Sequence, residues 1–199
     1  MFNQLIQCDH RLFHYINGTL SNSFFDWFMP VITNQNNWIL PLLVLIYWLL
    51  FRGDKRGRIT FVILIVTVIF IDAVSAQIIK PFIGRIRPSH AMPDMINLLV
   101  PRGGQFSFVS NHAANAFGLS VILGYFYPNW KWKVTALAFI IAFSRVYVGV
   151  HYPADVFFGA LFGYGSAWMI LSFWVILKMK ELKKGRDWVF EIYKRIHVC

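Results

Sequence analysis

Charged residues are scarce in this chain of 199 residues. They make up 14% of it, against about 25% in a soluble domain, while 57% of the residues are hydrophobic. This composition argues against a soluble globular protein, a disordered chain and a collagen-like repeat. The length suits one domain, and the sequence has no internal repeat and no low-complexity tract.

Cysteine is nearly absent too. Cys8 and Cys199 lie at opposite ends of the chain, without a CxxC motif or metal-ligand spacing, so we expect two unpaired thiols, no disulfide scaffold, no metal and no cofactor. The N-terminal stretch FNQLIQCDHR lacks the long apolar core of a secretory signal. No apolar run precedes Cys8, so a lipoprotein anchor is not expected either.

Long apolar runs are what the chain has in abundance. A helix needs about 20 apolar residues to cross a bilayer, and residues 59–79, 113–130, 134–150 and 153–177 each approach or exceed that length. Residues 38–51 are apolar but short, and they need part of the preceding Asn/Gln run to cross. The runs predict an all-α fold, an integral membrane helix bundle with five or six transmembrane helices.

The first 33 residues leave two alternatives open. Apolar residues alternate with polar ones between Leu12 and Phe24, which is typical of an amphipathic helix lying in the membrane interface. A short first span is the other alternative.

The net charge of +10 has two components. Basic groups in residues 51–58, 128–133 and 178–195 fall in alternate loops and the tail, which is typical of cytoplasmic segments. Because the charges are sorted by loop, nucleic-acid binding is disfavoured. The opposite face also carries basic residues, in 80–112, and binding of an anion is the natural reason for them.

Three short segments at span ends carry the chemistry, and the first is Lys80–Pro88. Prolines disfavour helix at the residue before them, so Pro81 and Pro88 predict a helix that ends near Lys80 and arginines on an extended, fixed turn. Anchoring to lipid headgroups is the alternative role of these cations. One span also holds an acid, Asp72, near the helical face of Lys80. We expect a structural role for it, either to neutralise a cation below the site or to bond to polar groups such as Asn115 or Gln77.

The second segment is Phe108–His112, ahead of an apolar helix. Ser110 or Asn111 is a good N-cap, and a helix N-terminus is a ready site for a phosphate or an oxyanion. The alternative is a simple cap with a surface histidine.

The third segment runs from Ser144 to Asp155. Arg145 lies in an apolar span, where a charge without a partner or cavity is costly, so a functional role is expected. Pro153 suits a first helical position, and Asp155 in the first turn lies where it can orient the imidazole of His151. The alternative is a helix start with an acid that matches the dipole.

Together the segments place cations, a hydroxyl and two histidines on one face. Arginine forks match phosphate oxygens, and phosphoryl transfer needs charge neutralisation, a nucleophile and a proton donor. The pattern resembles the membrane branch of the type 2 phosphatidic acid phosphatase superfamily, which shares its signature with vanadium haloperoxidases. The signature is matched by Lys80…Arg87-Pro88, in part by Val109-Ser110-Asn111-His112, and by Ser144-Arg145…His151…Asp155.

The resemblance implies a role for each matched residue. His151 would form a phosphohistidine, Asp155 would orient it, and His112 would protonate the leaving group and then activate water. A further group would hold the phosphoryl oxygens, with the backbone N–H of the asparagine as one donor: Lys80, Arg87, Ser110, Asn111 and Arg145. Arg85 and Arg102 are expected as further headgroup contacts. Val109 and Asn111 replace the family's Pro and Gly, and because Asn tolerates a left-handed backbone, we expect the loop to keep its shape.

The resemblance thus implies an enzyme, a metal-independent phosphatase of membrane lipids. We expect an N-terminal region over residues 1–33, a transmembrane catalytic domain over 34–178 and a basic cytoplasmic tail over 179–199. The favoured substrate is undecaprenyl diphosphate, hydrolysed at the extracytoplasmic face of a bacterial inner membrane, with lipid A 1-phosphate and phosphatidylglycerophosphate as alternatives. A non-catalytic transporter or binding protein for anionic lipids is the alternative of another class, and the span pattern opposes a soluble haloperoxidase.

Overall fold

A computed structural model describes residues 2–186, and over this part of the chain the fold is helical with no strand. This agrees with the predicted all-α class. The α-helices are α1 (Phe2–His14), α2 (Ser23–Thr33), α3 (Ile39–Tyr47), α4 (Asp54–Val74), α5 (Lys80–Ile83), α6 (Pro88–Ala91), α7 (Asn111–Phe126), α8 (Lys131–Tyr147) and α9 (Pro153–Lys183).

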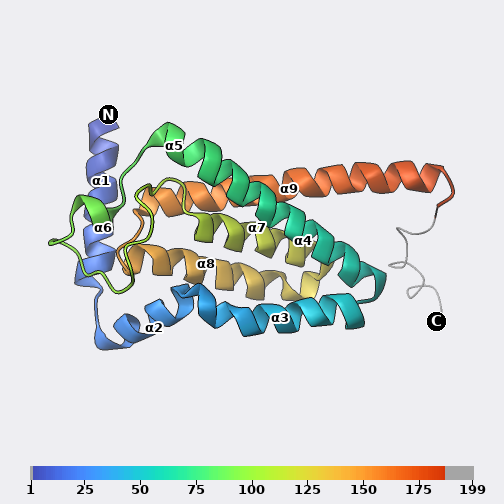
Figure 1. Ribbon diagram of the computed structural model, residues 1–199, viewed down its shortest axis with the longest axis horizontal. Coiled ribbons are helices and arrows are strands. Elements are labelled where there is room, and N and C mark those ends of the chain that lie inside the picture. Colours follow the sequence, from blue (N-terminus) through green and yellow to red (C-terminus); the bar gives the residue numbers. More distant parts are fainter. Residues whose placement is uncertain (1, 187–199) are drawn as a thin grey trace.

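The long helices form an elongated bundle built around α7. Helices α4, α8 and α9 all pack against α7, and α2 packs against α8. Helix α1 lies across one end of the bundle, at a steep angle to the others (Figure 1). We call this the α1 end. The loop between α6 and α7 and the first turns of α7 and α9 lie there too, whereas the connections 48–54 and 127–131 lie at the opposite end.

Two helical segments of the described chain are long and apolar enough to cross a membrane, Asp54–Ile83 and Pro153–Lys183. Helices α7 and α8 have 16 and 17 residues, about 24–26 Å at 1.5 Å per residue. Helix α7 ends earlier than expected because Pro128 follows it. Helices α2 and α3 follow one another along the bundle (Figure 1), interrupted by the short 3₁₀ turn Gln35–Trp38. The count of five or six spans remains a prediction.

The helix that carries Lys80 ends later than the sequence predicts. A wide π-type turn, Ser75–Ile79, leads into α5, and the helix continues to Ile83 despite Pro81. Proline is tolerated at the first position of a helical turn, where its missing N–H is not needed. The helix stops at Gly84, whose φ of 64° is left-handed.

Helices α7 and α9 touch backbone to backbone through glycine. A Cβ added to Gly163 would lie 1.9 Å from the carbonyl oxygen of Ala114, and one added to Gly159 would lie 2.7 Å from that of Ser110. Small residues four apart allow such close helix contacts in membranes. The Gly159–Gly163 spacing is visible in the sequence, but its importance was not predicted.

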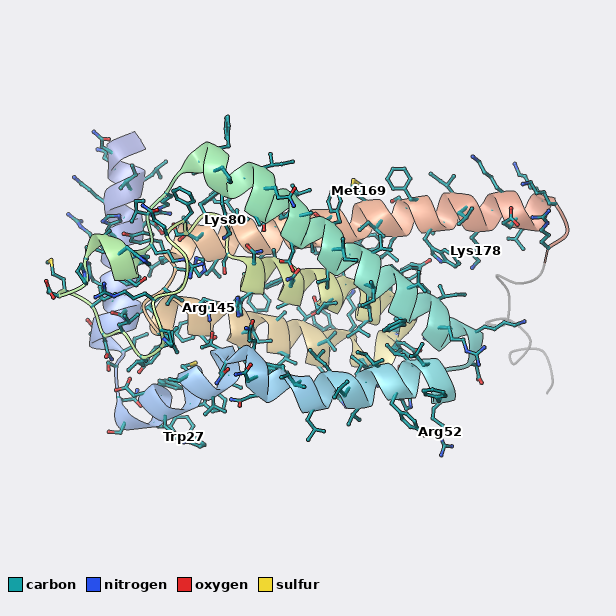
Figure 2. All side chains as sticks on the ribbon, viewed as in Figure 1. Trp27, Arg52, Lys80, Arg145, Met169 and Lys178 are labelled. Atoms are coloured by element: carbon teal, nitrogen blue, oxygen red, sulfur yellow. The ribbon has the colours of Figure 1, made fainter. Side chains whose placement is uncertain are left out.

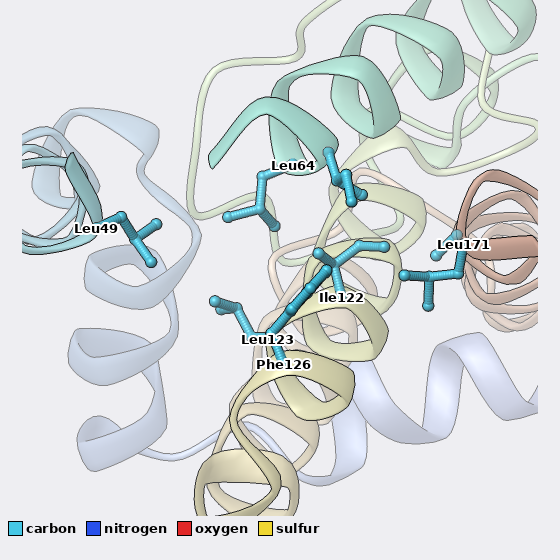
Figure 3. Close-up of a cluster of buried hydrophobic side chains, with 8 residues drawn as sticks. Leu49, Leu64, Ile122, Leu123, Phe126 and Leu171 are labelled. Carbon is cyan, nitrogen blue, oxygen red and sulfur yellow. The ribbon is translucent and has the colours of Figure 1, made fainter. Parts of the chain in front are cut away.

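The half of the bundle away from α1 is held by apolar packing. Buried side chains from α4, α7, α9 and the turn before α4 meet in one cluster (Figure 3). Its members are Leu49, Ile63, Leu64, Ile122, Leu123, Phe126, Ala167 and Leu171.

The two predicted terminal regions are partly described. Phe13 of α1 is fully buried whereas Leu12 is exposed, so only one face of the helix joins the bundle. At the other end α9 runs to Lys183, and Glu181 pairs with Lys184 and Arg186 at 3.4 and 3.2 Å. The remainder of the predicted tail, 187–199, lies outside the described residues.

Candidate active site

The three segments that the sequence singled out meet at the α1 end of the bundle. Helix α4 with its extension brings Lys80 there, α8 ends there with Arg145, and α7 and α9 both begin there (Figures 1 and 2). The described parts of the basic segments assigned to the cytoplasm, up to residue 186, lie at the opposite end, at the α3–α4 and α7–α8 connections and the end of α9. The structure therefore separates the two groups of cations as the sequence predicts.

A short extended pairing fixes Arg87. The N–H of Arg87 donates to Gln105 and that of Ser107 donates to the carbonyl of Arg85, at 3.0 and 2.8 Å. The Arg87 Nε donates to the carbonyl of Phe106 at 3.0 Å. A Cβ on Gly103, whose φ is 69°, would lie 2.8 Å from the Arg87 guanidinium. Glycine thus lets the loop close over this arginine, and the expected extended turn is confirmed.

Three cations at this end have no carboxylate partner among the described residues. Lys80 Nζ donates to the carbonyl of Val109 at 2.7 Å, and Arg145 donates to the hydroxyl of Thr33. Arg87 contacts only the carbonyl just described, and none of the three is within ion-pair distance of an acid. Arg145 is only 7% exposed. A buried charge without a counter-charge is costly, so this cluster is suited to an anion.

Ser110 lies at the N-cap position of α7, yet its hydroxyl does not cap the helix. Its Oγ is buried and has no hydrogen-bond partner among the described residues. Its N–H donates to the carbonyl of Asp155 at 3.0 Å, so the first turn of α9 holds it in place. His112 is the second residue of α7 and follows Ser110 by two residues. The unpaired backbone N–H groups at the start of this helix are suited to bind an anion.

Asn111 replaces the family's glycine, and the structure gives the replacement a different role from the one expected. Asn111 is the first residue of α7 and has an ordinary negative φ, since Asp54 is the one non-glycine residue with positive φ in the described chain. The left-handed conformation that an asparagine tolerates is therefore not used at this position. Its Nδ2 donates to Asp72 Oδ1 at 2.8 Å, and Asn115 donates to the same oxygen at 3.1 Å. The expected partner Asn115 is confirmed, and Asn111 was missed.

His151 and Asp155 lie together in the buried start of α9. His151 is 1% exposed and Asp155 0%, and Nδ1 of the histidine is 3.6 Å from Asp155 Oδ2. The same carboxylate oxygen accepts the Tyr152 N–H at 2.9 Å. Burial, followed by the charges of Arg87, Arg145 and Lys80, holds the pKa of His151 well below its usual 6.5. The imidazole is therefore neutral at pH 7, the form in which it is a nucleophile.

Arg85 differs from its neighbour Arg87. Its Nη1 donates to Asp155 Oδ1 at 2.9 Å, and its Nη2 donates to Asp9 Oδ2 at 2.5 Å. Both ends of its fork are taken by carboxylates, so it does not belong to the free cations. Arg102 lies exposed on the loop.

Comparison with known proteins identifies the family of this chain. The chain matches the PAP2 superfamily over residues 58–178. It is 32% identical to a lipid A 4'-phosphatase of Bacteroides thetaiotaomicron, over 85% of this chain and 78% of that protein. It is 24% identical to the undecaprenyl-diphosphatase BcrC of Bacillus subtilis, over 74% of this chain and 75% of the relative.

A solved structure has a similar fold. The crystal structure of Aquifex aeolicus LpxE is 27% identical, covers 81% of this chain and 93% of its own, and superposes with a TM-score of 0.64. The motif residues, the membrane helices and these relatives lead to the same assignment. The chain is an integral membrane protein and belongs to the PAP2 superfamily of phosphatases.

Proposed function

We propose that the chain hydrolyses a lipid phosphate through a phosphohistidine on His151, without a metal. The observation that carries the proposal is the cluster of Lys80, Arg87 and Arg145, three cations that have no carboxylate partner within residues 2–186 and act on a buried neutral histidine. Buried polar groups usually have partners, so the orphaned Ser110 Oγ also fits a site for phosphoryl oxygens.

The reaction has two steps. The Nε2 lone pair of His151 attacks phosphorus and the bond from phosphorus to the lipid oxygen breaks. That oxygen takes a proton from His112, which enters the step as the imidazolium because the bound phosphate offsets the surrounding positive charge. Water then attacks the phosphohistidine, giving its proton to His112, and the nitrogen–phosphorus bond breaks to release phosphate. The cations and Ser110 neutralise charge on the equatorial oxygens, and Asp155 next to Nδ1 orients the ring.

The α1 end is proposed to face the outside of a bacterial inner membrane. Its opposite end carries the basic loops expected in the cytoplasm. We propose five crossings, with α2 and α3 together as the first, and α1 in the interface. A lipid then keeps its tail in the bilayer while its phosphate enters at the span ends.

The relatives bear on the substrate. Similarity over most of the chain to a lipid A 4'-phosphatase makes a lipid A phosphate the first candidate. Undecaprenyl diphosphate, which we favoured from the sequence, is the second candidate because of the Bacillus subtilis relative.

Phosphate release from the purified protein tests the proposal, with lipid A, undecaprenyl diphosphate, phosphatidylglycerophosphate and phosphatidic acid as substrates. We expect turnover of at least one lipid, unaffected by chelator, and its loss in His151→Ala and His112→Ala. Phosphate release at wild-type rates by both variants would contradict the mechanism, and loss of activity in chelator would reveal a metal. Binding of these lipids without turnover would favour the transporter alternative.

Vanadate gives an independent test of the same pocket. It mimics the transition state of phosphoryl transfer and should compete with substrate. Turnover that is unchanged at high vanadate would count against a phosphoryl pocket of this kind.

A further inference from the structure

The N-terminal helix contacts the active site through one arginine. Arg85 lies between two carboxylates that are far apart in sequence, Asp9 on α1 and Asp155 on α9. The nitrogen–oxygen distances are 2.5 Å to Asp9 and 2.9 Å to Asp155. The side chain of Arg85 is 22% exposed and that of Asp9 11%, so the three groups form a chain that runs from the surface to the buried carboxylate.

Asp9 makes a second contact that fixes the geometry. Its Oδ1 accepts the N–H of Ala154 at 2.8 Å, one of the backbone groups that a helix leaves free in its first turn. One carboxylate of α1 therefore binds both Arg85 and the start of α9.

An aromatic ring completes the joint between α1 and α9. The Arg85 guanidinium lies over the ring of Tyr152 with its carbon 4.0 Å from the centroid, and His10 of α1 stacks on the same ring with centroids 4.8 Å apart. Such a cation over an aromatic face is favourable. Arg85 is thus held by two acids and a ring, and none of its contacts points to substrate binding.

The positive charges near Asp155 explain why its pairing with Arg85 matters for catalysis. Asp155 is fully buried and lies in the field of Lys80 and Arg87, whose charges also act on it. Without Arg85, Asp155 would keep only uncharged partners such as the Tyr152 N–H and would be drawn toward these cations. A free Arg85 would also compete for the phosphate. Pairing Arg85 with Asp9 and Asp155 keeps one oxygen of Asp155 next to His151 and leaves the other three cations to the substrate.

We propose that Asp9 and Arg85 are positioning residues, and that α1 holds Asp155 in the orientation that supports His151. This inference rests on the proposed phosphohistidine mechanism. Helix α1 then contributes to catalysis in addition to packing against the bundle.

The test compares kcat and KM for phosphate release in four variants. Arg85→Gln should lower kcat about 10- to 100-fold and Asp9→Asn about tenfold, the size seen when a supporting partner of an active-site group is lost. KM should stay within about twofold, because neither residue contacts the phosphate. Asp9→Glu keeps the charge and should recover most of kcat. Arg85→Lys should behave like Arg85→Gln, because one ammonium does not reproduce the two-pronged fork.

The double variant Asp9→Asn/Arg85→Gln separates coupling from independent effects. If Asp9 acts on Asp155 through Arg85, the double variant is no slower than Arg85→Gln alone. Arg11→Gln, an exposed cation on α1, and Asp94→Asn, an exposed acid of the loop at the same end, are matched controls that should keep wild-type kcat.

Three results would overturn the inference: wild-type kcat in folded Arg85→Gln, a change in KM alone, or multiplicative losses in the double variant. Thermal unfolding in detergent identifies variants that do not fold. If Arg85→Gln is one of them, the pair Asp9→Asn and Asp9→Glu decides, since equal kcat in these two would overturn the proposal. A wild-type protein that releases no phosphate from any lipid would instead refute the proposed function.

Discussion

Both ends of the bundle have buried apolar clusters, and they differ in the polar contacts that accompany this packing. At the α1 end, contacts join polar groups that are far apart in sequence, as when Asn17 donates to the carbonyls of Asn97 and Tyr147 at 2.7 Å each. In the other half, the contacts are apolar and the helices meet through leucine, isoleucine and alanine (Figure 3). Hydrogen bonds and ion pairs fix directions, whereas apolar packing fixes mainly volume and distance. The difference suggests that chemistry and stability can be altered separately.

Arg85 and Arg87 show the same contrast within one segment. They are two residues apart, yet two carboxylates bind the first and only a backbone carbonyl binds the second. In this site, the cations without an acid are the ones proposed to bind substrate.

The largest expected effect is the loss of kcat in His151→Ala, and Ile122→Ala is the matching variant in the apolar half. Loss of the nucleophile should lower kcat at least about 10⁴-fold with little change in thermal unfolding. Ile122 is fully buried in the apolar half, and truncating it should cost about 2–5 kcal/mol of stability while the folded fraction keeps its activity. Phosphate release and thermal unfolding in detergent measure both. If Ile122→Ala abolishes turnover in a folded protein, the two halves are not separable.

The glycines that bring α7 and α9 into contact give the next effect. Gly163→Ala places a methyl against the carbonyl of Ala114 and should destabilise by about 1–3 kcal/mol. Gly165→Ala is the matched control on the same helix. A Cβ there meets nothing within 4 Å, so alanine should stabilise by about 0.5–1 kcal/mol. Equal unfolding temperatures of the two variants would contradict the close contact of α7 and α9.

The pH dependence sharpens the contrast at the α1 end. Burial lowers the pKa of His151, and the charge of Arg87 is the next largest cause. The histidine therefore begins to take up a proton only at a pH lower than its usual 6.5. Arg87→Gln removes that charge and should raise the pKa of His151 toward 6.5. Because kcat/KM reports the free enzyme, its acid limb should begin at a higher pH in the variant. An acid limb at the same pH in both proteins would rule out this influence of Arg87.

The smallest expected effect is that of Asp72→Ala. It removes the acceptor of Asn111 and Asn115 and so loosens the start of α7, where Ser110 and His112 lie. We expect a loss of roughly tenfold in kcat/KM. Asn111→Gly, the family's residue, should lose less, because a glycine leaves no unpaired amide behind. A greater loss in Asn111→Gly would mean that the asparagine itself is needed.

Much of this arrangement could be predicted because it depends on local signals. Apolar runs predicted the helices, the prolines placed Arg87 on an extended segment, and the spacing of His151 and Asp155 predicted their proximity. The sequence also offered Ser110 as one of two N-cap candidates, and the structure selects it over Asn111. These signals extend over a few residues and survive in any fold that forms the same helices.

The remainder depends on contacts between distant segments. No local pattern predicts that Arg85 pairs with two carboxylates, because the partner Asp9 lies on a helix whose placement the sequence left open. The contact of Asn111 with Asp72 joins α7 to α4, and its only signal was an acid within an apolar span. The wide turn before Lys80 lets the helix continue past Pro81, against the preference that this proline indicated, and the helix ends at Gly84.

The phosphohistidine itself tests the account most directly. Wild-type protein is mixed with a lipid that it turns over, quenched in base within one turnover, and analysed by mass spectrometry for phosphate on histidine. The account predicts a base-stable, acid-labile phosphate on the peptide that contains His151, absent in His151→Ala and accumulating in His112→Ala if hydrolysis of the intermediate slows more than its formation. Turnover with no phosphate on His151, or with phosphate on another residue, would contradict it.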